Sequence, residues 1–175
     1  REQEAKPRDR ILEDWEERKL LHGCSLIPNT YLTKCVEFSL ETAIRQGEML
    51  NIHYDDIDFE NSLLHIPISK NGYPRKIPLS PKAVRILREL PRRLDRKVFP
   101  ITRDALKNLF QRALKKSNIQ EFRYHDLRHT AITSMLQDRG LTIPEVQLMS
   151  GIRNPKILLN VYNKTDPRKV VARLS

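Results

Sequence analysis

The sequence has 175 residues, 39% of them hydrophobic, which is enough for one buried core and rather little for two. Lys and Arg number 32 against 22 Asp and Glu, and the net charge of +10 favours a polyanion such as nucleic acid as partner, with an acidic membrane surface as the alternative. The two cysteines, Cys24 and Cys35, lack metal-ligand spacing and are too few for a disulfide-dependent fold, which fits a reducing, cytoplasmic compartment.

The N-terminal residues 1–10 mix charges without an apolar stretch, and no run in the chain reaches the roughly 18 apolar residues of a membrane span. We therefore expect no export signal and no membrane partner. The sequence opens in charged, helix-like residues without a Met, so we also expect a piece of a longer protein.

Two helices and three strands are predicted before residue 80. Helical periodicity covers residues 8–22 and again about 29–44, and it ends around Gly47. From residue 53 to 79 the apolar pattern becomes strand-like, with short strands at 55–59, 63–68 and 75–79 and a type I′ hairpin signal at Asn71-Gly72. The second helix is expected to bury one face, made of Leu32, Cys35, Val36, Ser39 and Ala43.

Helices resume after the strands. Ser80-Pro81 is an N-cap signal followed by Pro, and Thr102 caps a helix whose apolar residues fall at i, i+3, i+4, i+7 and i+8. A further helix is expected to begin near His125 and to end before Gly140, because glycine favours the left-handed backbone found there. The apolar face predicted after Thr102 consists of Leu106, Leu109, Phe110, Ala113 and Leu114.

Two shorter helices follow. Thr142 with Pro144 begins one, and Asn154-Pro155 begins a last one, which carries Tyr162. Taken together, the elements predict an α+β fold that is mainly α, a helical domain with a small three-stranded antiparallel sheet, formed as a single domain over residues 1–175.

Positive charge is concentrated between residues 85 and 116, where eleven residues are basic and three are acidic. A solvated helix face explains any single charge in this segment. The excess over the whole segment is larger than solubility requires, so it predicts a surface that follows a phosphate backbone.

The segment 124–130 brings a proton-transfer group and a cation together. His125 and Arg128 are three residues apart and would project from one face of a helix, with His129 beside them at i+4 from His125. The planar guanidinium of an arginine can bond two phosphate oxygens at once and keeps its charge. On its own this spacing is weak evidence and is more often found on a salt-bridged surface helix.

Together with this motif, other segments of the chain resemble, in the same order, the conserved segments of the tyrosine recombinase (phage integrase) family. Residues 41–50 resemble its first arginine box, which makes Arg45 the first catalytic arginine and Glu48 its supporting carboxylate. The strand-like section resembles its three-stranded sheet and puts Lys70 at the position of the hairpin lysine. Residues 125–130 are similar to the second arginine box, 149–151 to the third box, and 161–164 to the nucleophile region with Tyr162.

The resemblance implies the DNA breaking-rejoining fold and a metal- and ATP-independent enzyme without a cofactor. Arg45 and Arg128 would hold the non-bridging phosphate oxygens, and His125 would donate or relay a proton. Lys70 would protonate the departing 5′ oxygen, and Tyr162 would end bonded to the 3′ phosphate. Left to itself, Tyr162 could be an ordinary core tyrosine, and Lys70 a solvated turn residue.

The pattern departs from the family at one position. The third box normally continues with His or Trp, which donates a hydrogen bond to the phosphate, and here that residue is Ile152. Either one contact to the transition state is missing, or a neighbour such as Arg153 or His129 supplies it. The chain also has no room for the N-terminal core-binding domain that family members carry, so we expect the catalytic domain of a longer protein.

The leading hypothesis is a site-specific recombinase or integrase of a mobile element, bacterial or phage-encoded and acting in the cytoplasm. Its expected partner is double-stranded DNA, bound by a tetramer of the full-length protein on two DNA sites, with a monomeric state possible for the fragment. Two alternatives stay open: relaxation of DNA as in type IB topoisomerases, and a DNA-binding relic of the fold that no longer cleaves.

Overall fold

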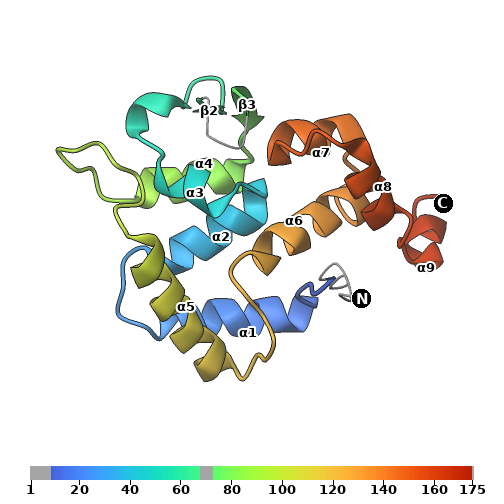
Figure 1. Cartoon of the computed structure of the whole chain (residues 1–175), viewed down its shortest axis with the longest axis horizontal. Helices are drawn as coiled ribbons and strands as arrows, with labels where there is room; N and C mark the ends of the chain where they lie inside the picture. Colours follow the sequence, from blue (N-terminus) through green and yellow to red (C-terminus); the bar gives the residue numbers. More distant parts are fainter. Residues whose placement is uncertain (1–8, 68–72, 175) are drawn as a thin grey trace, which may run out of the picture.

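The computed structural model describes residues 9–67 and 73–174. Helices surround a central helix, and a small sheet lies at one edge of the molecule (Figure 1). In chain order the elements are α1 (Asp14–Ser25), α2 (Leu32–Thr42), α3 (Gln46–Leu50), the 3-10 turn η1 (Tyr54–Asp56), β1 (Ile57–Asp58), β2 (Leu63–Ile66), β3 (Arg75–Pro78), α4 (Pro81–Glu89), α5 (Arg103–Ser117), α6 (Asp126–Gln137), α7 (Ile143–Ser150), α8 (Pro155–Tyr162) and α9 (Pro167–Val171).

The sheet has the order β1-β2-β3 and is antiparallel throughout, as predicted. Leu64 pairs with Ile57 on one side and with Ile77 on the other, so three apolar residues stand side by side across the sheet. The strands are shorter than the sequence pattern indicated, and the first of them begins later because residues 54–56 form a 3-10 turn. The predicted hairpin at Asn71-Gly72 lies outside the described residues.

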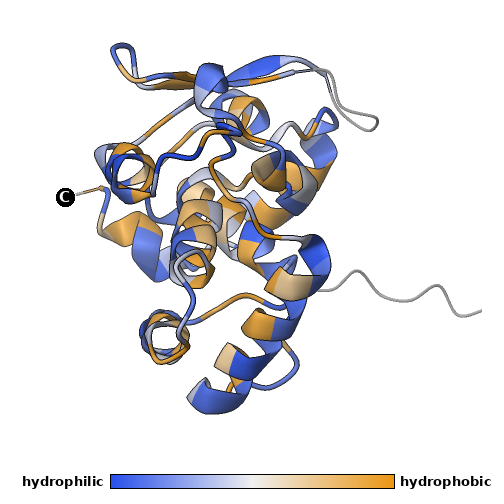
Figure 2. Ribbon diagram, turned by 90° about the vertical axis from the view of Figure 1, so that its left-hand side faces the viewer, coloured by the Kyte–Doolittle hydropathy of each residue, from blue (hydrophilic) through white to orange (hydrophobic). Residues whose placement is uncertain are grey.

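Helix α2 forms the centre of the core and packs against α1, α4, α5 and α6. Its predicted inner face is confirmed, since all five residues of that face are buried. Phe38 of the same helix meets Phe99 with their ring centroids 5.4 Å apart. Figure 2 shows hydrophobic residues along one side of the helices and hydrophilic residues along the other, as expected for helices around one core.

Four predicted helix caps are also confirmed. Ser80, Thr102, Thr142 and Asn154 each accept a hydrogen bond from a backbone N–H in the first turn of the helix that follows. Within the described ranges, no helix combines the length and the apolar character needed to cross a bilayer.

Three expectations about helices need correction. The first helix begins at Asp14, because its Glu13 cap fixes the start, and it runs to Ser25. The chain re-enters a helix at Gln46, where a break was predicted, after Ala43 ends α2 in the left-handed conformation with a φ of 53°. The helix that carries Tyr162 is followed by α9, which begins at an Asp-Pro cap that the sequence reading passed over.

Replacement of Thr102 by Ala tests the cap of α5. The Thr102 side chain accepts from the backbone N–H of Ala105 at 3.1 Å, and loss of such a cap costs about 1 kcal/mol of unfolding free energy. Urea unfolding of Thr102→Ala should show this loss. Thr102→Ser keeps the hydroxyl and should stay close to the wild type, so equal losses in both variants would contradict the capping role.

Candidate active site

Arg45 and Glu48 are brought together by the turn between α2 and α3. Arg45 is the N-cap residue of α3, with an extended backbone (φ −68°, ψ 140°), and Glu48 follows at the third helical position. The Glu48 carboxylate accepts from the backbone N–H of Arg45 at 3.3 Å and from its Nη1 at 3.3 Å. Local geometry therefore fixes the first predicted arginine beside its predicted carboxylate.

Glu48 has a second and closer partner that the sequence analysis missed. Arg75, the first residue of β3, donates from Nη1 and Nη2 to the two carboxylate oxygens at 2.9 and 2.8 Å. Both side chains are buried, at 1% exposure for Arg75 and 4% for Glu48. Burial alone would raise the pKa of Glu48, but the hydrogen bonds and charge of Arg75, together with Arg45, outweigh it and hold the pKa below its usual value.

Arg128 reaches the same place from α6. Its Nη1 donates to the carbonyl oxygen of Ala43 at 2.5 Å and to that of Ser150 at 2.7 Å. Burial, followed by the charges of Arg45 and Arg75, lowers the pKa of Arg128 to about 10, while the charge of Glu48 opposes the shift. The group remains protonated at neutral pH, in a cluster that holds more positive than negative charge.

The turn after α7 is where the arginines converge. Arg45 donates from Nη2 to the carbonyl oxygen of Gly151 at 3.2 Å, and Arg128 binds the preceding carbonyl. Gly151 has a φ of 71°, and a Cβ there would lie 2.8 Å from Cζ of Arg75 and 3.0 Å from Nη1 of Arg45. Only glycine satisfies both the backbone and the close approach.

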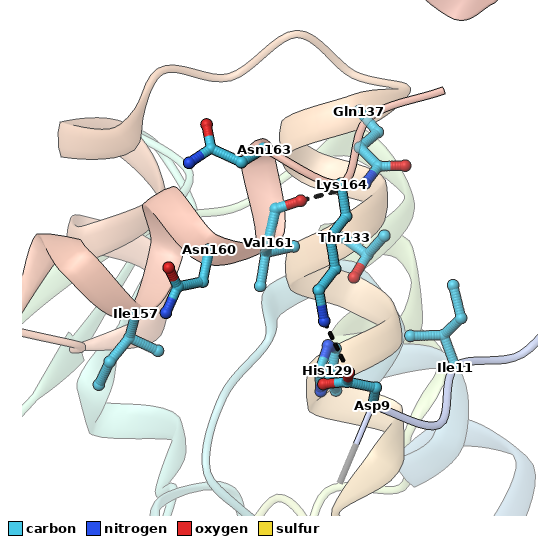
Figure 3. A pocket seen from close by; sticks show the side chains of 10 residues that line it. All are labelled: Asp9, Ile11, His129, Thr133, Gln137, Ile157, Asn160, Val161, Asn163 and Lys164. Atoms are coloured by element: carbon cyan, nitrogen blue, oxygen red, sulfur yellow. Dashed lines mark hydrogen bonds and ion pairs between the residues drawn. The ribbon is translucent and has the colours of Figure 1, made fainter. Parts of the chain in front are cut away.

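The two predicted histidines have different surroundings. His125 is the exposed residue before α6, and burial of part of its ring, followed by the charge of Arg128, lowers its pKa. His129 is partly buried and lines an open pocket between α6 and α8. Figure 3 shows it beside Asp9, which pairs with Lys164 at 2.6 Å. None of the described hydrogen bonds joins His129 to the arginines.

Tyr162 is the last residue of α8, a helix that packs on α6 and α7. Its side chain is 46% exposed, so the alternative of an ordinary core tyrosine is wrong. Among the described residues no side chain forms a hydrogen bond with its hydroxyl. Lys70 lies outside the described residues.

The residues after Gly151 are held by their backbone. Gln147 donates to the carbonyl oxygens of Ile152 at 3.2 Å and Arg153 at 2.7 Å. Ile152 packs partly buried against the core, while Arg153 is exposed with its guanidinium 4.3 Å from the ring centroid of Tyr73. A cation thus stands next to the position where the sequence lacks the expected donor.

The structure therefore unites Arg45, Glu48 and Arg128 of the predicted set and adds Arg75. A sequence signal for Arg75 existed, because it stands in register with Ile77 on the inward side of a strand, where a charged residue is unusual. In the described part of the chain, no group of three or more His, Cys, Asp or Glu side chains is arranged to hold a metal ion.

Gly151→Ala should be more damaging than Gly140→Ala. Both glycines have a positive φ, 71° and 69°, and the left-handed backbone alone costs about 1–2 kcal/mol for alanine. At Gly140 nothing lies within 4 Å of the added methyl group, whereas at Gly151 it meets Arg75, which Glu48 holds in place. Urea unfolding of the two variants measures the difference, and equal losses would contradict the close approach of Arg75.

His125 should make the wild type lose stability in mild acid. Its pKa is lowered in the folded chain, so protonation favours the unfolded state, and stability falls as pH drops below about 6.5 until the lower folded pKa is passed. His125→Gln should not show this loss. The measurement is urea unfolding of both proteins at pH 7.5 and pH 5.5, and a parallel pH dependence would contradict the shift.

The sequence is similar to those of known recombinases and integrases. The model of the phage integrase family matches residues 10–169. The shufflon-specific DNA recombinase of Escherichia coli is 36% identical over 151 residues, which cover 86% of this chain and 39% of that protein. Tyrosine recombinase XerA of Saccharolobus solfataricus is 28% identical over 149 residues, covering 84% of this chain and 50% of that protein. The chain thus spans half or less of the length of these two relatives.

Solved structures share the fold. A crystal structure of XerA recombinase superposes with a TM-score of 0.72 at 19% identity, covering 99% of this chain and 65% of that one. A lambda integrase dimer bound to a COC′ core site gives a TM-score of 0.73 at 20% identity, covering 94% of this chain and 50% of that one. The predicted fold class is therefore confirmed, and the chain belongs to the phage integrase family of tyrosine recombinases.

Proposed function

We propose that this chain is the catalytic domain of a site-specific DNA recombinase, which cleaves and rejoins strands through a covalent 3′-phosphotyrosine intermediate. The observation that carries the proposal is a cluster of three arginines: Arg45 and Arg75 pair with the Glu48 carboxylate. Arg45 and Arg128 bind the carbonyl oxygens of Gly151 and Ser150 in the turn after α7. Three guanidinium groups with one carboxylate leave an excess of positive charge. A phosphate group matches that excess, and the more negative transition state of its transfer matches it better.

The two predicted arginines offer different access to a phosphate. The Arg45 side chain is 31% exposed and opens toward solvent, while Arg128 is buried with its Nη1 bonded to two carbonyl oxygens. Arg45 would therefore be the first to bind a non-bridging oxygen, and Arg128 would bind the phosphate from the buried side of the site. His125, lowered in pKa and neutral at pH 7, can accept or donate a proton beside Arg128.

Tyr162 is the proposed nucleophile. A phenol has a pKa of about 10 and attacks only when it is aimed at phosphorus and the charge that develops is stabilised. Its exposure on α8 lets a DNA backbone reach it. No direct contact between Tyr162 and the arginines is required, because the scissile phosphate would lie between them. The general-acid role of Lys70 rests on the resemblance of its sequence position.

Arg153 is the better candidate to replace the donor that Ile152 lacks. It follows Ile152 directly and its guanidinium is exposed over Tyr73, so it can turn toward a bound phosphate. His129 instead lines the pocket between α6 and α8, beside the Asp9–Lys164 ion pair. We therefore propose that Arg153 donates the hydrogen bond to the phosphate that Ile152 cannot donate, and that His129 supports the fold.

Double-stranded DNA is the proposed partner. Solved relatives with this fold include a XerH site-specific recombinase bound to its difH substrate and the lambda integrase dimer on its core site. The basic segment 85–116 supports the same partner, although Arg93 and Arg96 are paired with Asp95 and Asp55 and contribute less than their number indicates. We propose that the full-length protein acts as a tetramer on two DNA sites, in a bacterial cytoplasm and as part of a mobile element.

Tyr162→Phe tests the proposal directly. On a nicked suicide substrate the full-length wild type should form a covalent adduct that survives a denaturing gel, and Tyr162→Phe should form none. The DNA dissociation constant should change by less than about twofold, because one oxygen is lost and phosphate contacts dominate affinity. Tyr31→Phe is the matched control, since Tyr31 lies at the start of α2, and it should cleave like the wild type.

The same proteins decide between the alternatives. Exchange between two cognate sites on a plasmid indicates a recombinase, and relaxed plasmid without exchange indicates a topoisomerase. A wild-type protein that binds DNA and forms no adduct would support the alternative of a DNA-binding relic that no longer cleaves. An adduct from Tyr162→Phe would mean that the nucleophile is another residue.

A further inference from the structure

We infer that Arg75 is a positioning residue of the cleavage site, which fixes Glu48 and the Gly151 turn and through them the guanidinium of Arg45. The inference rests on the proposed function, because Arg45 is the proposed first clamp on the scissile phosphate. Arg75 itself is almost completely buried and has no access to DNA. Its action must therefore pass through its neighbours.

The contacts of Glu48 show the first route. Each carboxylate oxygen accepts one hydrogen bond from each arginine: Oε1 from Nη1 of Arg75 at 2.9 Å and Nη1 of Arg45 at 3.3 Å, and Oε2 from Nη2 of Arg75 at 2.8 Å and the backbone N–H of Arg45 at 3.3 Å. The shorter, two-pronged pair with Arg75 sets the orientation of the carboxylate. The orientation of the carboxylate in turn sets the orientation of the Arg45 guanidinium, which bonds to it.

The second route runs through Gly151. The guanidinium of Arg75 lies against this glycine so closely that a Cβ would come within 2.8 Å of Cζ. The carbonyl oxygen of Gly151 accepts from Nη2 of Arg45, and that of Ser150 accepts from Nη1 of Arg128. The side chain of Arg75 thus packs against the turn whose carbonyl oxygens bind the two proposed phosphate-binding arginines.

Stability alone is a poor reason for this buried arginine. Its Nε is buried without a hydrogen-bond partner, and buried ion pairs can often be replaced by apolar residues without loss of stability. A lysine could supply the charge but not the planar fork that holds both oxygens of Glu48. These costs are explained if the site needs a carboxylate whose orientation does not vary.

The test measures single-turnover cleavage by the full-length protein on the suicide substrate at saturating DNA. Arg75→Met should slow cleavage by about 10-fold to 100-fold, a loss comparable to that of one misdirected transition-state contact, while DNA affinity changes by less than about threefold. Arg75→Lys should recover part of the rate. Lys76→Met is the matched control, because Lys76 is the next residue of β3 and is exposed, and it should cleave at the wild-type rate.

Two further readouts separate positioning from general damage. If Arg75 acts through Glu48, the double variant Arg75→Met with Glu48→Gln should be about as slow as the slower single variant, whereas independent effects would multiply. A methylphosphonate at the scissile position is neutral, so it lacks the negative charge that Arg45 would bind in a phosphate. On this substrate the rate defect of Arg75→Met should therefore be smaller. Loss of packing would slow cleavage of both substrates equally.

Every outcome bears on the inference. A folded Arg75→Met or Arg75→Lys that cleaves like the wild type overturns it, as does a multiplicative loss in the double variant or an equal defect on both substrates. Failure of both Arg75 variants to fold, judged by thermal unfolding, also overturns it in favour of a purely structural role. If the wild type forms no adduct, the proposed function has failed instead.

Discussion

The buried carboxylate of Glu48 is the constraint on which the site depends. Among the residues that the structure describes, it is the one carboxylate that pairs with this arginine cluster, and it joins the start of α3 to the start of β3. Removal of one partner from a buried ion pair typically costs about 3–5 kcal/mol, because the other charge is left uncompensated. That figure applies to the Arg75 pair; the Arg45 pair is partly exposed and weaker. The fold thus maintains a cluster of like charges that would otherwise disperse.

The same cluster explains why the site can exist before any phosphate arrives. The pKa of Arg128 is lowered to about 10 chiefly by burial and then by neighbouring arginines, so the fold itself bears the cost of concentrating positive charge. A phosphate would relieve that repulsion instead of having to assemble the cluster. Charges placed in advance need little reorganisation during the reaction, which is how fixed donors stabilise a transition state.

Sequence reasoning succeeded where the signal is local. The caps at Ser80 and Thr102, the buried face of α2 and the order of the three strands follow from spacing and side-chain type within a few residues. It failed where tertiary contacts decide. The pairing of Arg75 depends on Glu48, 27 positions away, and α3 follows a turn in which Ala43 takes a left-handed conformation that alanine rarely adopts. Helical spacing placed His129 near His125, whose pKa it affects, but could not show that His129 also lines a pocket with residues of α8.

The proposed nucleophile is held much less firmly than the arginines. Leu158 is the one fully buried side chain of α8, whereas Ile157, Leu159 and Tyr162 are each at least 40% exposed. Few buried contacts mean that such a helix can shift at a small cost in free energy. The arginine cluster is built from α3, β3, α6 and the end of α7, which the core fixes. In the proposed reaction the rigid part of the domain would therefore locate the phosphate, and the accuracy of attack would depend on the position that α8 takes on DNA.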